Sequence, residues 1–528
     1  MENYSALFVF GDSLSDNGAV FALTGGTIPP TEITGVDLNG DAVDFAARGI
    51  FYDQKFTNGD VYADIAAGLL AVPGDTSTFY DDFNGSNFAV GGATATDLTA
   101  LGGTASNTFA DQVAAFQSAL GALPGTAEET SAFLSGAAAS VFIGLNDLGA
   151  LGGAATTTGT IDQNVINIGV NAIISDISTQ SQALAASGVG TIILNKVPSG
   201  SFFPSSNTLN DLLGPGTAEA FDAVSAAVNQ GIEGVAAGLQ AAGTNVEIVD
   251  FYSLATEVQA DAETFGFLTL ENALPGSDAD NTLLISDTPI DQVGFIDPVH
   301  FTAELHEVFG AFQAMTLGNT QLDGDADSGT HIGGTGDETI FANGGDDTVS
   351  SNAGDDLVFA GGGNDNVFAG SGHDIAFGGT GGDLLSGNAG DDILSGGSGV
   401  DFLIGGTGYN VLAGGADNDA LFAGEEMDLL IGGGGNDVLA GRDGDDIAIY
   451  DASVTENNAD IFFGDAGVDT LLIVSETAID NVDMFLAEAG VKLISVENVL
   501  TVTAAELEAY DFGALAGVAA TADLYGLI

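Results

Sequence analysis

The first 318 residues alternate short apolar runs with longer segments in which apolar residues recur at helical spacing. Between residues 221 and 239, for example, apolar side chains recur at steps of three and four, as in a helix that packs on a sheet. Because strands and helices alternate in this way, we expect right-handed crossovers and a doubly wound parallel sheet, an α/β domain. Four apolar runs are typical of its buried strands: residues 7–10, 140–145, 191–197 and 246–251.

Residues 333–449 follow a different pattern, which divides into thirteen consecutive nonapeptides without an insertion. The eighth position of every nonapeptide is apolar, and the first four positions are rich in glycine. A flexible glycine-rich linker has no reason to keep a buried-type residue at one fixed position through thirteen repeats. We therefore expect glycine turns that join short strands, with the eighth side chain inward and two nonapeptides in each coil of an all-β parallel β-roll.

A polar segment rich in glycine and aspartate separates the two patterns and is expected to be a linker. The predicted organisation is an α/β domain at 1–318, a linker at 319–332, a β-roll at 333–475 and a C-terminal cap at 476–528.

The sixth position of the nonapeptide is acidic in every repeat except one, where Asn410 stands. If a coil takes 18 residues, these side chains stack in two columns, one along each edge of the roll. Carboxylate oxygens together with turn carbonyls suit Ca²⁺, whose coordination is large and flexible, better than Mg²⁺. Asn410 removes a charge, and Asp417 and Glu426 replace glycine at position four, so the sites that touch these repeats stay open. The expected calcium ligands are Asp347, Asp356, Asp365, Asp374, Asp383, Asp392, Asp401, Asp419, Asp428, Asp437 and Asp446.

The block resembles the RTX calcium-binding repeat, whose pattern is G-G-x-G-x-D-x-U-x with U apolar. This resemblance implies several structural Ca²⁺ ions as the cofactor.

Charge and composition exclude several kinds of partner. Five Lys+Arg against 75 Asp+Glu give a formal charge of -70, which repels nucleic acid and anionic membranes. The absence of cysteine excludes disulfides, thiolate nucleophiles and cysteine-based zinc sites. The sequence contains no run of 18 apolar residues, which a transmembrane helix would need, and the N-terminus lacks the basic and apolar regions of a signal peptide.

An acidic chain without cysteine resembles the substrates of type I secretion, which implies a secreted protein and the secretion machinery as a partner. The resemblance puts an uncleaved signal in the tail after about residue 475. A surface adapted to salty water is an alternative interpretation of the same charge.

Four short segments carry candidate catalytic residues. Taken alone, the serine in the first could simply cap a turn, because Gly, Asp, Ser and Asn are common turn residues. In this order, however, the segments resemble the four blocks of the GDSL, or SGNH, hydrolase family, and the resemblance covers roughly residues 5–315. The segments are GDSLSDNG (11–18), NFAVGGATA (87–95), FIGLNDLG (142–149) and FIDPVHFT (295–302).

The resemblance implies a catalytic triad of Ser13 as nucleophile, His300 as general base and Asp297 as the acid that orients the base. The implied oxyanion donors are the backbone N–H of Ser13, the N–H of Gly91 and the side-chain amide of Asn146. Gly92 fits the glycine role equally well.

Elimination among the four histidines also favours His300 as the base. His331 and His373 fall in the linker and the repeats. His306 lies in an apparent helix, where a solvated or capping role is expected.

These residues predict a carboxylic-ester hydrolase, a lipase or esterase that forms an acyl-enzyme and acts on an ester or lipid substrate. A phospholipase or acyltransferase of the same family is one alternative. A calcium-dependent surface or matrix protein with a non-catalytic hydrolase fold is another.

Overall fold

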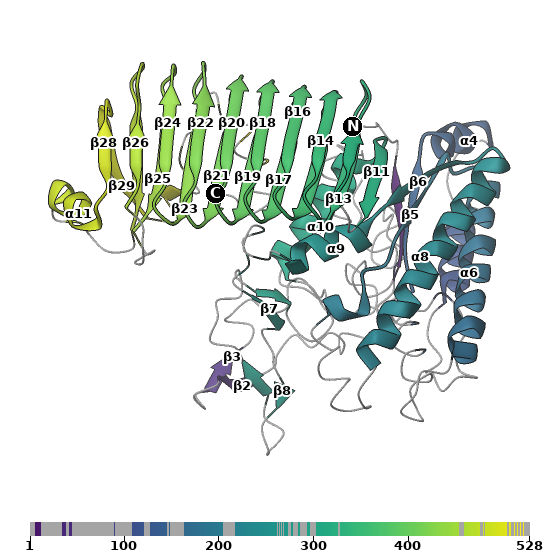
Figure 1. The fold of residues 1–528 in the computed structure, drawn as a ribbon. Coiled ribbons are helices and arrows are strands. Elements are labelled where there is room, and N and C mark those ends of the chain that lie inside the picture. The colour runs from purple at the N-terminus through teal and green to yellow at the C-terminus, as the bar shows by residue number, and fades with distance from the viewer. Residues whose placement is uncertain are drawn as a thin grey trace. The chain divides into compact units, whose positions relative to one another are not determined.

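The computed structural model of the chain forms two compact units (Figure 1). The first comprises residues 1–259 and 267–318, and the second comprises residues 260–266 and 319–528. The structure describes residues 6–11, 34–37, 42–44, 108–120, 127–144, 163–203, 217–260, 269–272, 276–277, 283–285, 293–295, 302–325, 328–452, 459–475 and 481–503, with single residues between and beyond these ranges.

The core of the first unit is a parallel sheet of four strands. The strands pair in register, so that Gly11 lies opposite Phe142 and their carboxyl ends meet at one edge of the sheet. The first three strands are buried along their whole length, as their apolar sequences predict. The strand order is β1 (Leu7–Gly11), β4 (Ala138–Phe142), β5 (Thr191–Asn195) and β6 (Asn245–Val249).

Helices pack on both faces of this sheet. The rings of Phe8 and Phe10 lie 4.9 and 5.7 Å from that of Phe116. On the opposite face, Phe142 lies 5.1 Å from Phe251. The predicted α/β fold with a parallel sheet is therefore confirmed. The helices are α3 (Phe109–Leu120), α4 (Ala127–Ser135), α6 (Gln163–Ala186), α8 (Thr217–Ala241), α9 (Phe251–Ala260) and α10 (Ala303–Thr316), with a short 3-10 helix η2 (Gly200–Phe202).

A buried polar link joins α10 to the middle of the sheet. The side-chain amide of Gln313 donates to Ser140 Oγ at 3.1 Å and to Asn195 Oδ1 at 2.7 Å. Both partners lie on strands, so this link stabilises the core rather than a loop at the sheet edge.

Short strands complete the described part of the first unit. One small sheet has the order β3 (Ala42–Asp44), β2 (Thr34–Asp37), β9 (Leu283–Ile285) and β8 (Gly276–Ser277), and β7 (Thr269–Asn272) pairs with β10 (Val293–Phe295).

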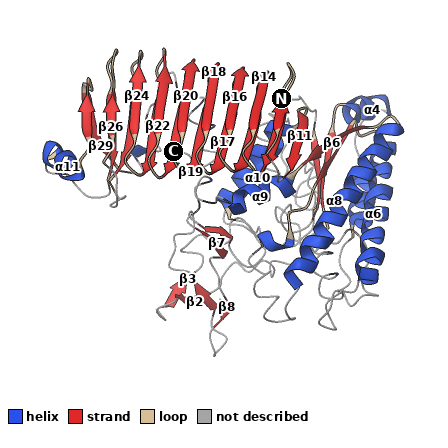
Figure 2. Ribbon diagram, viewed as in Figure 1, coloured by secondary structure: helices blue, strands red, loops and turns tan. Residues whose placement is uncertain are grey.

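The second unit is a β-roll of two parallel sheets, with a helix α11 (Val482–Ala489) near its C-terminal end (Figures 1 and 2). One sheet contains β11 (Thr320–Asp325), β13 (Glu338–Asn343), β15 (Leu357–Gly362), β17 (Ile375–Thr380), β19 (Ile393–Ser398), β21 (Val411–Ala416), β23 (Leu429–Gly434), β25 (Ile447–Asp451), β27 (Thr470–Val474) and β29 (Asn498–Val502). The other contains β12 (Thr330–Ile332), β14 (Thr348–Ala353), β16 (Asn366–Ser371), β18 (Leu384–Ala389), β20 (Phe402–Thr407), β22 (Ala420–Gly424), β24 (Val438–Arg442), β26 (Ile461–Phe463) and β28 (Lys492–Ile494).

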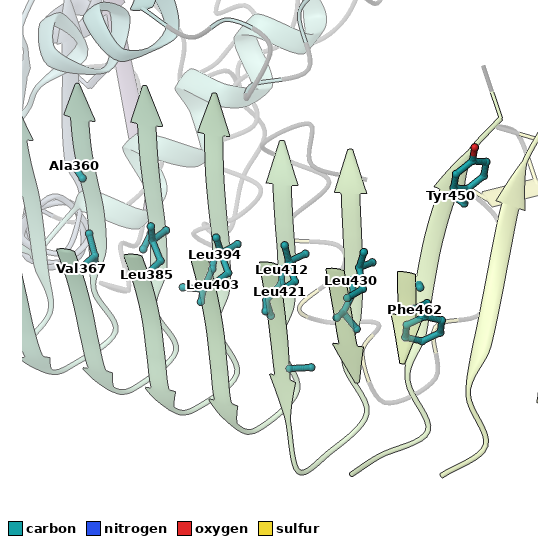
Figure 3. Close-up of a cluster of buried hydrophobic side chains, with 14 of the residues drawn as sticks. Ala360, Val367, Leu385, Leu394, Leu403, Leu412, Leu421, Leu430, Tyr450 and Phe462 are labelled. Atoms are coloured by element: carbon teal, nitrogen blue, oxygen red, sulfur yellow. The ribbon is translucent and has the colours of Figure 1, made fainter. Parts of the chain in front are cut away.

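The side chains at position eight form the core between the two sheets (Figure 3). Leu394 pairs with Leu412, 18 residues further along, which confirms two nonapeptides in each coil. Both side chains are fully buried, as are Leu385 and Leu403 in the facing sheet. Many strands are six residues long, because positions seven to nine of one repeat continue into positions one to three of the next repeat before the turn begins.

The roll extends beyond the limits that the sequence predicts. The segment 319–332 is not a linker, because it contributes β11 and β12, and Thr320 pairs with Glu338 at the 18-residue spacing. After residue 475, β28 and β29 continue the two sheets. Longer connections between coils hide this continuation from a search for a strict period of nine.

A stack of phenylalanine rings lies on the outside of the first sheet of the roll. Phe341, Phe359 and Phe377 occupy position nine of successive coils, with neighbouring ring centroids 4.9 and 5.0 Å apart. Phe265, from the segment 260–266, stacks on Phe377 at 5.4 Å. This short segment therefore packs with the roll.

Among the described helices, none combines the length and the apolar character that crossing a membrane requires.

Candidate active site and calcium-binding turns

The first and third candidate catalytic segments follow the ends of strands in the main sheet of the first unit. Ser13 comes two residues after the end of β1, and Asn146 comes four residues after the end of β4. Since Gly11 and Phe142 pair in register, these two segments leave neighbouring strands at the same edge of the sheet. The predicted catalytic and oxyanion residues themselves lie outside the described residues, so their roles stay predictions: Ser13, Gly91, Gly92, Asn146, Asp297 and His300.

A buried carboxylate links the second and third segments. Asp147 directly follows Asn146 and is fully buried. Its Oδ2 accepts a hydrogen bond of 2.6 Å from the backbone N–H of Ala95. This hydrogen bond therefore links the segment of Gly91 to the segment of Asn146, the two expected oxyanion donors besides Ser13.

The fourth segment leads directly into α10. Thr302, two residues after His300, is buried and caps the helix, since its hydroxyl accepts from the N–H of Leu305. The cap fixes the residue at which the helix begins. His306, the fourth residue of the helix, is 1% exposed, so the expectation of a solvated role for it is wrong, and the alternative of a capping role stays a prediction.

The position-six residues of the roll form the two expected columns. In one column, the backbone N–H of Asp365 donates to Asp383 Oδ1, and that of Asp383 donates to Asp401 Oδ1, each at 2.7 Å. The same bond from each coil to the next runs along both columns, with distances of 2.6 to 3.0 Å. All eleven predicted calcium ligands are at most 3% exposed.

The second oxygen of these carboxylates is buried in a turn that contains backbone carbonyls. The Oδ2 atoms of Asp374, Asp383 and Asp392 are buried and have no hydrogen-bond partner among the described residues. A Cβ built on Gly378 would lie 2.5 Å from Asp383 Oδ2 and 2.6 Å from the carbonyl oxygen of Gly396. Position one of this repeat is therefore glycine because carboxylate and carbonyl oxygens crowd the space beside it.

Burial makes these carboxylates costly to ionise without a counter-ion. It raises the pKa of Asp374 and Asp383 to about 7 and that of Asp392 and Asp419 to about 8. Neighbouring carboxylates in the column add to the increase. A bound cation would favour the ionised form and reverse this effect.

The donor set fits Ca²⁺. The turns of Asp383 and Asp392 offer hard carboxylate and carbonyl oxygens, with a buried carboxylate oxygen that has no hydrogen-bond donor among the described residues. Within the described part of the chain, no group of three or more carboxylate, imidazole or thiolate side chains is placed to hold a metal ion. The assignment of individual ligands stays a prediction.

Asn410 keeps the hydrogen-bond pattern of its column but not the charge. Its Oδ1 accepts from the N–H of Asp392 at 3.0 Å, and its own N–H donates to Asp428 Oδ1 at 2.6 Å. The side-chain amide occupies the place of the second carboxylate oxygen, and its nitrogen donates to the carbonyl of Gly408. One candidate site therefore lacks a ligand charge.

The columns continue past the strict repeats, which the sequence analysis missed. The N–H groups of Asp437 and Asp446 donate to Asp460 Oδ1 and Asp469 Oδ1, each 23 residues further along rather than 18. An alignment that allowed variable spacing and matched the acidic residue before each later strand to position six could have found Asp460 and Asp469.

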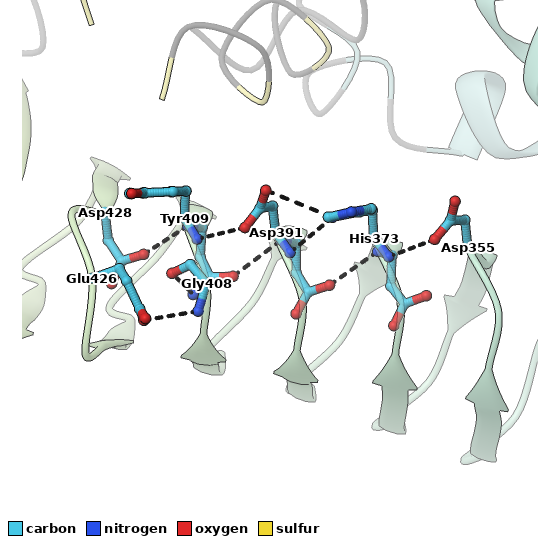
Figure 4. Close-up of polar contacts among 10 residues, drawn as sticks. Asp355, His373, Asp391, Gly408, Tyr409, Glu426 and Asp428 are labelled. Carbon is cyan, nitrogen blue, oxygen red and sulfur yellow. Dashed lines mark hydrogen bonds and ion pairs between the residues drawn. The ribbon is translucent and has the colours of Figure 1, made fainter. Parts of the chain in front are cut away.

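The sequence analysis also missed a further column, which is formed by residues at position five of the repeats (Figure 4). Here the bonds run the other way, because Asp355 Oδ1 accepts from the N–H of His373, and His373 Nδ1 accepts from that of Asp391. Asp391 Oδ1 in turn accepts from the N–H of Tyr409. These residues are largely exposed and varied in type, which hides their common role in the sequence.

Comparison with family models gives two matches. Residues 7–311 match the GDSL-like lipase/acylhydrolase model. Four copies of the RTX calcium-binding nonapeptide repeat match residues 332–367, 368–403, 395–426 and 422–452. No curated protein matches the chain.

Without calcium, the roll should be less stable at pH 8 than at pH 5. The folded-state pKa values of about 7 to 8 lie above the ordinary value of about 4, so these groups stabilise the folded roll when protonated. That contribution is present below pH 4 and is lost as the pH rises through 7 to 8. Thermal melts followed by circular dichroism, on protein stripped with a chelating resin, measure it. Equal stability at the two pH values would contradict the expectation.

Asn410→Asp should add about one calcium ion per chain, because it restores a charged oxygen to an otherwise complete column. Equilibrium dialysis measures the number of ions bound. Asn418→Asp is the matched control, since Asn418 is an exposed position-five residue of the next repeat. An unchanged number of ions in Asn410→Asp, or an equal gain in the control, would refute the assignment of position six.

Proposed function

The chain belongs to the GDSL-like lipase/acylhydrolase family, and we propose that it hydrolyses carboxylic esters through an acyl-enzyme on Ser13. The observation that carries the proposal is the pairing of Gly11 with Phe142. It brings together the starts of the segments that hold the proposed nucleophile and Asn146. The family match over residues 7–311 spans all four catalytic segments.

In the proposed reaction, His300 accepts the proton of the Ser13 hydroxyl as its oxygen attacks the ester carbonyl carbon. The tetrahedral intermediate collapses when the C–O bond to the alcohol breaks, and His300 returns the proton to the leaving alkoxide. Water then attacks the acyl-enzyme with His300 again as base, which releases the carboxylic acid and restores Ser13. Asp297 orients the imidazole and stabilises its charged form.

The negative oxygen of each tetrahedral intermediate needs hydrogen-bond donors. We assign this role to the N–H of Ser13, the N–H of Gly91 and the amide of Asn146, each worth on the order of 3 kcal/mol of barrier. The hydrogen bond from Ala95 to Asp147 supports this assignment, because it links the loops of the last two donors.

The roll has a separate role in this proposal. RTX repeats bind calcium, and the buried columns suit that ion, so we assign structural Ca²⁺ to the turns of the roll. None of the proposed catalytic residues lies in the repeats. Secretion by a type I system, with a signal in the C-terminal tail, is part of the same proposal and rests on the acidic, cysteine-free composition.

Ser13→Ala should lower the turnover of a short-chain 4-nitrophenyl ester by roughly four orders of magnitude or more, because no other group takes over as nucleophile. Ser15→Ala, in the same segment, is the matched control and should stay active. Initial rates at saturating substrate give the comparison. Substantial activity in Ser13→Ala would refute the nucleophile, and an inactive wild type would favour a non-catalytic binding role.

Asp297→Ala should be about ten- to a hundredfold milder than His300→Ala, since the acid orients the base but does not transfer the proton. The kcat values of the two variants with the same ester test the order. A larger loss in Asp297→Ala would mean that the two roles are wrongly assigned.

A further inference from the structure

A buried glutamine holds the backbone just ahead of the proposed nucleophile. Gln112 lies on α3, and its side chain makes two hydrogen bonds to Gly11. Its Oε1 accepts from the backbone N–H of Gly11 at 3.0 Å, and its Nε2 donates to the backbone carbonyl of Gly11 at 2.7 Å. Gly11 is the last residue of β1, the end strand in the described four-stranded sheet. The amide therefore pairs with Gly11 as an additional strand would.

The location of Gln112 is not explained by packing. The buried face of α3 otherwise consists of Phe109, Val113 and Phe116, and Gln112 lies among them with 1% of its surface exposed. An amide in such a place costs free energy unless its groups are hydrogen-bonded, and a methionine would fill the same volume without that cost. The two bonds to Gly11 satisfy the amide, and they fix one particular peptide segment.

Covalent geometry connects this segment to the reaction. The N–H of Gly11 belongs to the peptide that precedes it, and its carbonyl belongs to the peptide between Gly11 and Asp12. The next peptide, between Asp12 and Ser13, carries the N–H that the proposed function uses as an oxyanion donor. The φ and ψ angles of a single residue, Asp12, therefore separate the plane that Gln112 holds from the plane of that donor.

We propose that Gln112 is a positioning residue for the nucleophile and its oxyanion donor. The proposal rests on the proposed function, because it takes Ser13 as the reacting group. By holding both peptides of Gly11, Gln112 limits how the Ser13 segment leaves the sheet. Displacements of about 1 Å in such a segment cost roughly a hundredfold in rate, so fixing it matters for turnover more than for substrate affinity.

The test compares Gln112→Met with Gln313→Met in the full-length protein with calcium. Both substitutions replace a buried amide with an apolar side chain of similar shape. Gln313 is bonded to the side chains of Ser140 and Asn195 rather than to the backbone that leads into a catalytic segment. For each variant, the unfolding midpoint is measured first, and kinetics with a short-chain 4-nitrophenyl ester are run well below it. Labelling of Ser13 by a fluorophosphonate gives a second measure of nucleophile reactivity.

Gln112→Met should lower kcat and the labelling rate by roughly 10- to 100-fold, with KM within about twofold of the wild type. Gln313→Met should lose as much stability or more and keep its kcat. Gln112→Glu retains the acceptor for the Gly11 N–H but loses the donor to the carbonyl, so it should fall between wild type and Gln112→Met.

Three results would overturn the proposal. If Gln112→Met retains kcat and labelling, or if both methionine variants lose kcat in proportion to lost stability, Gln112 is only a structural residue. If the wild type neither turns over esters nor reacts at Ser13, the proposed function itself fails, and the positioning role fails with it. Wild-type turnover separates these cases.

Discussion

The roll depends on one constraint, the burial of carboxylates in columns. In each column, one carboxylate oxygen accepts a backbone N–H from the preceding coil, and the glycine turn buries the other. Hydrogen bonds to the first oxygen favour the ionised form, but burial has the larger effect and raises the pKa values. A divalent cation shared by carboxylates and carbonyls would offset that cost, so we expect ion binding and folding to be coupled in this part of the chain.

The α/β unit contains a core of another kind. Its strands are buried between helices on both faces, and phenylalanine rings such as Phe8, Phe116, Phe142 and Phe251 pack closely on the sheet. Several of its buried polar side chains have backbone or side-chain partners, as at Gln112, Gln313 and Lys196. Burial alone would lower the pKa of Lys196, but its ammonium lies 2.7 Å from Asp250 and 3.0 Å from Glu233, and these two carboxylates raise the pKa above its ordinary value.

Local patterns predicted most of the fold. The inward leucines and the columns 18 residues apart follow from a strict period of nine, which sequence shows directly. The first coil did not follow from it, because β11 and β12 are recognisable only through their pairing with the next coil. The later coils were missed because their connections are longer.

In the α/β unit, His306 and Gln112 are polar residues on buried faces, and only the contacts of other elements reveal this. The catalytic residues were predicted from the order of four segments. That assignment still depends on the sequence, because those residues lie outside the described part of the chain.

The most direct test of this account is hydrogen exchange on the full-length protein at neutral pH, with calcium and after its removal. Removing calcium should abolish amide protection from β13 to β29, while β1, β4, β5 and β6 keep theirs, because only the roll needs the ion to bury its carboxylates. Retained protection of the roll without calcium, or loss of protection in both units together, would contradict the account.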